Sequence, residues 1–106
     1  MSLPVEPNVL PLEGEIDLHV SPRVAQALGV MIEKKPTRLV IDLSAVSYID
    51  SSGLAVLIEG MQNVEAYGGK FILVGLHDNV KPIFEIARLD RVFIILPDVD
   101  AALAAI

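Results

Sequence analysis

Three short apolar segments, separated by stretches with helical periodicity, constrain the fold of this chain more than any other feature. The segments cover residues 38–43, 71–76 and 92–96 and read RLVIDL, FILVGL and VFIIL. Apolar runs of this length are typical of strands buried on both faces of a sheet. The stretches between them show the i, i+3, i+4, i+7 spacing of amphipathic helices. Strands that alternate with helices predict an α/β layer fold with a mostly parallel sheet.

Capping residues mark where the longer helices should start and stop. Ser21, which precedes a proline, is expected to be the N-cap of the first helix, and Pro36 is expected to end it. A second helix is expected to open at Ser51 or Ser52 and to end at the glycine pair of residues 68–69. Its sheet-facing stripe is expected to comprise Leu54, Leu57, Ile58, Met61 and Val64.

The remaining elements are shorter. Residues 9–17 are expected to form one or two short strands, with Gly14 as a bulge or turn, and another extended piece is expected at residues 46–49. No helix separates the first strands from one another, which predicts an antiparallel edge. Two more helices are expected over residues 80–89 and 99–106.

The expected fold is therefore α/β, with a four- to five-stranded, mostly parallel sheet, an antiparallel edge and about four helices. Asp78 or Asn79 is expected to cap the third helix. The core is expected to include Leu39, Ile41, Leu57, Ile58, Phe71, Leu73, Phe84 and Ile94.

Composition excludes several classes of protein. Hydrophobic residues make up 53% of the 106 residues and charged residues 21%, which excludes intrinsic disorder and is typical of a globular domain. We expect a single domain over residues 1–106, with residues 1–7 as a flexible N-terminus. The absence of cysteine excludes disulfides, cysteine-ligated metals and thiol nucleophiles.

Charge and hydropathy limit the partners. The net charge of −6 disfavours binding to nucleic acid or to anionic lipid. The longest strictly apolar run, residues 101–106, is far shorter than the roughly 20 residues that a membrane-spanning helix needs. The N-terminus does not have the pattern of a signal peptide. We therefore expect a cytoplasmic protein without direct membrane insertion, whose partners are other proteins.

The loop before the second helix is the first candidate for a functional site, because functional residues of open parallel sheets gather at the carboxyl ends of strands. Asp50, Ser51 and Ser52 stand together there, followed by Gly53. The free N–H groups and the dipole of a helix N-terminus can accept an anion such as a phosphate. One serine could simply cap the helix, but a cap needs one hydroxyl and two are present. Gly53 is expected to leave the approach to Ser52 open.

Two other kinds of site are disfavoured by the residues present. A serine hydrolase would need one of the chain's two histidines as a base, and its nucleophile motif would need a glycine where Ile49 stands. A metal site would have to combine Asp17, Asp42 and Asp50. Asp42, however, lies within a buried strand and is expected to form hydrogen bonds with nearby loops. No metal and no other cofactor is therefore expected.

Most of the chain, residues 8–104, resembles the STAS domain family in the form found in bacterial anti-sigma-factor antagonists. The specific part of the resemblance is D-L-S at residues 42–44, followed by I-D-S-S-G-L-A-V-L at residues 49–57. L-E-G-E-I-D at residues 12–17 looks like the family's Gly-Glu-Leu-Asp segment, and the glycine pair at residues 68–69 is where the family has one. The resemblance implies a single STAS domain that is not an enzyme.

The resemblance also implies a mechanism of regulation. Family members of this type are phosphorylated on a serine by a partner kinase, which is itself the anti-sigma factor, and a serine phosphatase resets the cycle. The unphosphorylated antagonist binds the kinase and frees the sigma factor. The phosphoacceptor is the serine before the glycine, here Ser52, and Asp17 and Asp50 match acidic positions near it. Ser51 and Gly53 complete the surroundings of the phosphorylation site, and Ala55 stands where the family commonly has glycine.

Helical periodicity suggests where the partner would bind. Ala55, Val56 and Glu59 lie on the side of the second helix opposite its sheet-facing stripe, which makes them the expected contact residues for the kinase. One alternative stays open within the same family. The domain could be a non-switching accessory subunit of a transport or lipid-transfer complex, with Ser52 serving only as a helix cap.

Overall fold

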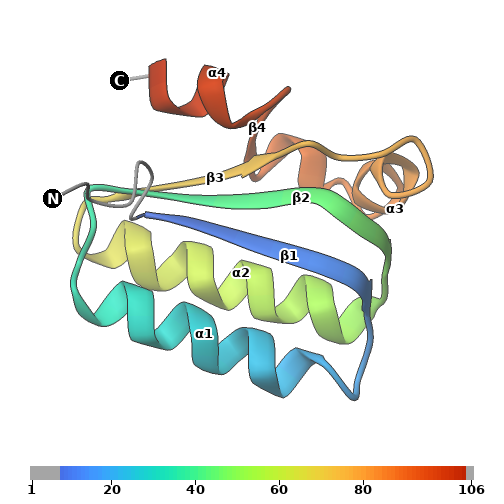
Figure 1. Cartoon of the computed structure of the whole chain (residues 1–106), viewed down its shortest axis with the longest axis horizontal. Coiled ribbons are helices and arrows are strands. Elements are labelled where there is room, and N and C mark those ends of the chain that lie inside the picture. Colours follow the sequence, from blue (N-terminus) through green and yellow to red (C-terminus); the bar gives the residue numbers. More distant parts are fainter. Residues whose placement is uncertain (1–7, 105–106) are drawn as a thin grey trace, which may run out of the picture.

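A four-stranded sheet with helices on both faces forms the centre of the computed structural model, which describes residues 8–104 (Figure 1). The strands are β1 (Val9–Ile16), β2 (Arg38–Ile49), β3 (Lys70–Val74) and β4 (Ile94–Leu96). The helices are α1 (Ser21–Glu33), α2 (Ser51–Ala66), α3 (Lys81–Ile86) and α4 (Val99–Ala104), with a short 3-10 turn, η1 (Leu89–Arg91). The strand order β1-β2-β3-β4 follows the sequence. The expected flexible N-terminus, residues 1–7, lies outside the described residues.

The helices divide the hydrophobic core between the two faces of the sheet. Helices α1 and α2 lie side by side on one face, and α4 lies over the other (Figure 1). Alternate residues of β2 point to opposite faces. Leu39 and Ile41 therefore belong to the larger core under α1 and α2, whereas Val40 belongs to a smaller one with Ala102 of α4. Within residues 8–104, no helix is both long and apolar enough to cross a membrane.

The sheet is parallel in all three strand pairings of the described residues. The expected antiparallel edge is therefore not found within residues 8–104. Residues 9–16 form one continuous strand in which Gly14, at φ +74°, is a bulge with a register shift and not a turn. Without a hairpin, α1 carries the chain across to a parallel β2. The separate extended piece expected at residues 46–49 is the last part of the same long β2.

Two of the eight expected core residues are less buried than predicted. Ile58 is only partly buried, and Ile94 is 43% exposed. β4 is a three-residue edge strand whose successive side chains point to opposite faces of the sheet. Ile95 packs against the larger core, so Ile94 points to the other face. The other six expected residues are buried as predicted, namely Leu39, Ile41, Leu57, Phe71, Leu73 and Phe84.

Two helix caps differ from the sequence-based expectation. Val20 occupies the N-cap position of α1, with Ser21 as the first helical residue, and Val80 does so for α3. In both cases a backbone carbonyl closes the preceding turn. The Asp17 carbonyl accepts the N–H groups of Val20 and Ser21. Before α3, the His77 carbonyl accepts the N–H groups of Val80 and Lys81. The terminal helix is described to Ala104, and the last two residues of its expected range lie outside the described residues.

Candidate functional site

The candidate site lies where two parallel strands end and two helices begin. β1 ends at Ile16 and α1 begins at Ser21, while β2 ends at Ile49 and α2 begins at Ser51. The Asp50 N–H donates to the Ile16 carbonyl at 3.1 Å, which holds the two loops together. The carboxyl ends of neighbouring parallel strands are the usual position of functional residues in such sheets. The expected location of the site is therefore also where the fold brings its residues together.

Asp50, and neither serine, is the N-cap of α2. Its backbone is extended, and one carboxylate oxygen accepts the N–H of Ser52 at 2.9 Å and that of Gly53 at 3.2 Å. The expectation that Ser51 or Ser52 caps the helix is therefore wrong. A carboxylate can satisfy two free N–H groups at once, and its negative charge suits the positive end of the helix dipole. Both hydroxyls are left free of the capping role.

The Ser52 hydroxyl is bonded to the same carboxylate. Its Oγ lies 2.5 Å from Asp50 Oδ1, within the range of strong, charge-assisted O–H···O⁻ hydrogen bonds. This bond is the main reason why the pKa of Asp50 is lowered from its ordinary value of 3.8. Desolvation opposes the lowering, and the N–H groups of Gly53, Ser52 and Leu18 add to it. Asp50 is therefore held in its charged form against the hydroxyl.

A second hydroxyl contacts Ser52 from the first helix. Ser21 Oγ lies 2.9 Å from Ser52 Oγ and 2.7 Å from the Asp17 carbonyl oxygen, to which it can donate. The sequence suggested only a capping role for Ser21. Its contact with Ser52 could have been anticipated from the topology, because neighbouring parallel strands place the starts of their following helices side by side.

The other expected residues of the site have less direct roles. The Asp17 carboxylate accepts the N–H groups of His19 at 3.0 Å and Val20 at 3.2 Å, so it orders its own loop. Asp17 is linked to Ser52 only through its backbone carbonyl and Ser21. Ser51 is exposed at the first position of α2.

Gly53 does not leave an opening beside Ser52. It is buried, and a Cβ at this position would lie 2.7 Å from Ile49 Cγ1, 2.8 Å from Ile16 Cγ2 and 3.0 Å from the Ile16 carbonyl oxygen. The expectation of open access across Gly53 is wrong. The residue is a glycine because the first turn of α2 packs directly on the ends of β1 and β2. Its role is to let α2 start this close to the sheet.

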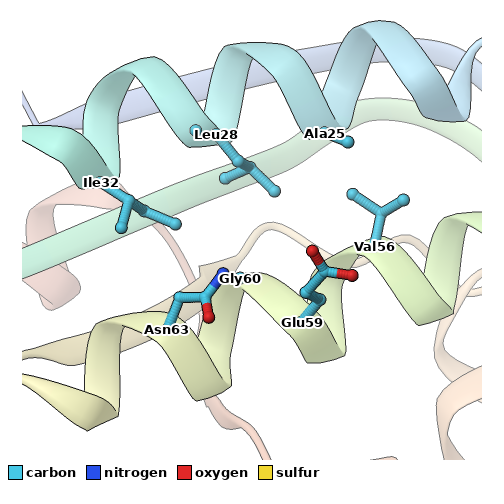
Figure 2. Close-up of a pocket in the computed structure, with 8 residues that line it drawn as sticks. Ala25, Leu28, Ile32, Val56, Glu59, Gly60 and Asn63 are labelled. Carbon is cyan, nitrogen blue, oxygen red and sulfur yellow. The ribbon is translucent and has the colours of Figure 1, made fainter.

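The expected partner contacts on α2 are only partly outward-facing. Ala55 and Glu59 are exposed, but Val56 is partly buried and points towards α1 (Figure 2). A hollow between the two helices is lined by Ala25, Leu28, Gly29, Ile32, Val56, Glu59, Gly60 and Asn63. Gly60 lets α2 pack closely on both α1 and β3, since a Cβ there would lie 3.0 Å from Phe71 Cε1 and 3.2 Å from Leu28 Cδ1.

A second hollow beside the site was not anticipated. It lies between the start of α2 and α3, with Asp50 and Ser51 on its border, and Tyr48, Ile49, Leu54, Ile83, Ile86 and Ala87 also line it. Tyr48 is 48% exposed and Ile86 is 84% exposed. Sequence periodicity does not reveal this apolar surface, because it forms only when α3 packs next to the loop.

The two disfavoured kinds of site gain no support from the geometry. His77 Nε2 contacts the Ser44 carbonyl oxygen, whereas the partners of the Ser52 hydroxyl among the described residues are Asp50 and Ser21. Asp42 accepts the N–H of Ser44 at 2.9 Å, as expected for a carboxylate that orders a loop.

Fold and site together define a small α/β domain that presents a serine hydroxyl between two helix starts. The profile of the STAS domain family matches residues 1–102, and the chain belongs to this family. It is 38% identical over 79 residues to the anti-sigma-B factor antagonist of Listeria monocytogenes, covering 74% of this chain and 69% of that protein.

Solved structures show the same fold in two settings. An anti-sigma factor antagonist from Mycobacterium paratuberculosis is 34% identical, with a TM-score of 0.84 over 92% of this chain and 82% of that one. The STAS domain of a SulP transporter from Vibrio cholerae is 25% identical, with a TM-score of 0.74 over 98% of this chain and 83% of that one. The fold alone therefore does not separate regulators from transporter domains.

Proposed function

We propose that the protein is a cytoplasmic anti-sigma-factor antagonist that is switched by phosphorylation of Ser52. The observation that carries the proposal is the state of the Ser52 hydroxyl. Asp50 caps the helix, so Ser52 is not needed as a cap, and its proton is donated to a carboxylate at 2.5 Å. The names of the relatives support the same class of function. The protein acts by binding and does not itself catalyse a reaction.

In the proposed reaction, an anti-sigma-factor serine kinase supplies ATP. Ser52 Oγ forms a bond to the γ-phosphorus, the bond from this phosphorus to the bridging oxygen breaks, and ADP leaves. The hydroxyl proton passes to the Asp50 carboxylate, to which it is already donated, and from there to water. A serine phosphatase returns Ser52 to its free hydroxyl by hydrolysis of the ester.

Phosphorylation should alter the surface more than the fold. The phosphoryl group adds about −1.5 to −2 charge at pH 7. The N-terminus of α2 attracts this charge, while the Asp50 carboxylate repels it, so the two effects oppose each other. A kinase that packs on this surface must then bury a hydrated dianion. An unpaired buried charge costs several kcal/mol, which is more than enough to weaken binding tenfold.

The proposed kinase-binding surface surrounds Ser52. Ala55, Val56 and Glu59 extend it along α2, and the exposed side chains of Tyr48 and Ile86 lie across the loop beside α3. Exposed aromatic and aliphatic side chains next to polar groups are common at protein interfaces. Glu59 and the net charge of −6 favour a partner with a basic surface.

The alternative function is that of an accessory domain in a transport complex, and the Vibrio cholerae neighbour is the observation that keeps it under consideration. In that case phosphorylation of Ser52 would have no part in the function. The geometry favours the switch, because an accessory domain would not require a serine hydroxyl that the cap leaves free.

The experiment combines phosphorylation with binding. Each anti-sigma-factor kinase encoded in the source genome is mixed with the protein and ATP, the phosphorylated residue is mapped, and kinase affinity is measured by calorimetry. We expect phosphate on Ser52, wild-type affinity for Ser52→Ala, and at least tenfold weaker binding for Ser52→Asp. Phosphate on Ser51, or wild-type affinity for Ser52→Asp, would contradict the proposal.

A further inference from the structure

Ser21 is a buried hydroxyl that contacts the proposed phosphoacceptor. Its side chain is 4% exposed, and it is the only polar side chain among residues 8–104 that is buried to this degree. A hydroxyl loses hydration when it is buried, so it must form hydrogen bonds in compensation. The contacts of Ser21 are the Asp17 carbonyl oxygen and Ser52 Oγ.

The hydrogen bonds around Ser52 need more protons than the two hydroxyls supply. Three oxygen–oxygen contacts run in a chain from Asp50 to Ser52, from Ser52 to Ser21 and from Ser21 to the Asp17 carbonyl. The two hydroxyls supply one proton each, so two protons serve three contacts. The Ser52 proton goes to the charged carboxylate, which is the strongest acceptor. The Ser21 proton can therefore serve either Ser52 Oγ or the Asp17 carbonyl.

This arrangement holds the Ser52 hydroxyl from both sides. Asp50 takes its proton, and the Ser21 proton, when it points to Ser52, occupies one of the two lone pairs of Oγ, which leaves the second lone pair for attack on phosphorus. The Asp17 carbonyl does not depend on the Ser21 hydroxyl, because it already accepts two backbone N–H groups, that of Val20 at 3.1 Å and that of Ser21 at 2.8 Å. The Ser21 hydroxyl is therefore available to Ser52.

We propose that Ser21 is a positioning residue that keeps the Ser52 hydroxyl in one rotamer for phosphoryl transfer. This inference rests on the proposed phosphorylation of Ser52. After transfer, Ser52 has no proton to give, and the Ser21 proton turns to the ester or phosphoryl oxygens. Because Ser21 is the first residue of α1, it also links the state of Ser52 to the start of that helix.

The test uses Ser21→Ala, which removes the hydroxyl and keeps a residue that helices accept well. Ser44→Ala is the matched control, because it removes the same hydroxyl at a different place. Ser44 is exposed and borders a separate hollow, lined also by Pro97 and Val99, that includes neither Ser21 nor Ser52. Initial rates of Ser52 phosphorylation are measured against concentration of the antagonist. We expect kcat to fall roughly three- to tenfold in Ser21→Ala, the effect of one lost hydrogen bond, with KM unchanged. Ser44→Ala should match the wild type in both constants.

A second measurement does not need the kinase. The Hα–Hβ coupling constants of Ser52 report its χ1 rotamer by NMR. We expect one rotamer in the wild type and in Ser44→Ala, and averaged couplings in Ser21→Ala. A wild-type kcat or a single Ser52 rotamer in Ser21→Ala would overturn the role of Ser21 while leaving the proposed function intact. Absence of phosphate on wild-type Ser52 would overturn the proposed function, and the role of Ser21 in phosphoryl transfer with it.

Discussion

Gly53→Ala should destabilise the protein although alanine is a better helix former than glycine. The new Cβ would lie 2.7 Å from Ile49 Cγ1 and 2.8 Å from Ile16 Cγ2. Carbon atoms prefer separations of about 3.5–4.0 Å, so the overlap is about 0.7–0.8 Å or more. Both isoleucines are fully enclosed at 1% exposure, and the Ile16 carbonyl at 3.0 Å belongs to the backbone. The atoms that must move have little free space.

The magnitude follows from two opposing effects. Overpacking of a closed core costs about 1–3 kcal/mol. Replacing glycine by alanine in a helix contributes about 1 kcal/mol of stability. The net loss for Gly53→Ala should therefore be about 0–2 kcal/mol. Gly53→Val should lose more, since it places two further methyl groups in the same space and has a poorer helix propensity.

Gly29→Ala is the matched control. Gly29 lies within α1, and a Cβ there would have no neighbour within 4 Å. It should gain up to about 1 kcal/mol from helix propensity alone. Urea denaturation of the wild type and both variants gives the free energies of unfolding, with the m-values as a check on two-state behaviour. If Gly53→Ala were stabilised as much as Gly29→Ala, the close packing of α2 on β1 and β2 would be wrong.

Two further predictions concern the core and the cap. Leu57→Ala should lose about 2–5 kcal/mol in urea denaturation, because it truncates a fully buried side chain, and a loss within error would mean that the wrong face of α2 has been assigned to the core. The pKa of Asp50 is lowered in the folded state, chiefly by the Ser52 hydroxyl. The charged carboxylate therefore stabilises the fold above its ordinary pKa of 3.8, and this stabilisation is lost as the pH falls through the lower pKa of the folded state. The free energy of unfolding, measured for the wild type and Asp50→Asn between pH 2 and 7, should therefore show an extra loss at acid pH in the wild type only. Parallel curves of this free energy against pH would contradict the role of the Asp50 carboxylate as the cap of α2.

The sequence contains enough information to predict the class of fold and the position of the site. The apolar runs at residues 38–43 and 71–76 lie in β2 and β3, and the periodic stretches before and between them form α1 and α2. These elements depend on local patterns of hydrophobicity, which are visible in one dimension. The loop at Asp50 was also recognisable, because the order of strand, polar residues and helix is itself a local pattern.

The tertiary structure decided which groups contact one another. The N-cap of α2 could have been any of three neighbouring polar residues, and only the path of the backbone at the end of β2 assigned it to Asp50. The parallel direction of β1 depended on whether Gly14 formed a turn or a bulge, a choice that its pairing with β2 settles.

The roles of Gly53 and Ser21 lay furthest from the sequence pattern. Gly53 is enclosed by Ile16 and Ile49, and Ser21 reaches Ser52 across 31 positions of the chain. Such contacts arise when separate elements pack at van der Waals distance, and the residue types on one element do not specify their partners on another. The sequence by itself determined the elements, the apolar faces and the polar loop between β2 and α2. Only packing of α1 and α2 on the sheet brought the Asp50, Ser52 and Ser21 oxygens into one hydrogen-bonded chain.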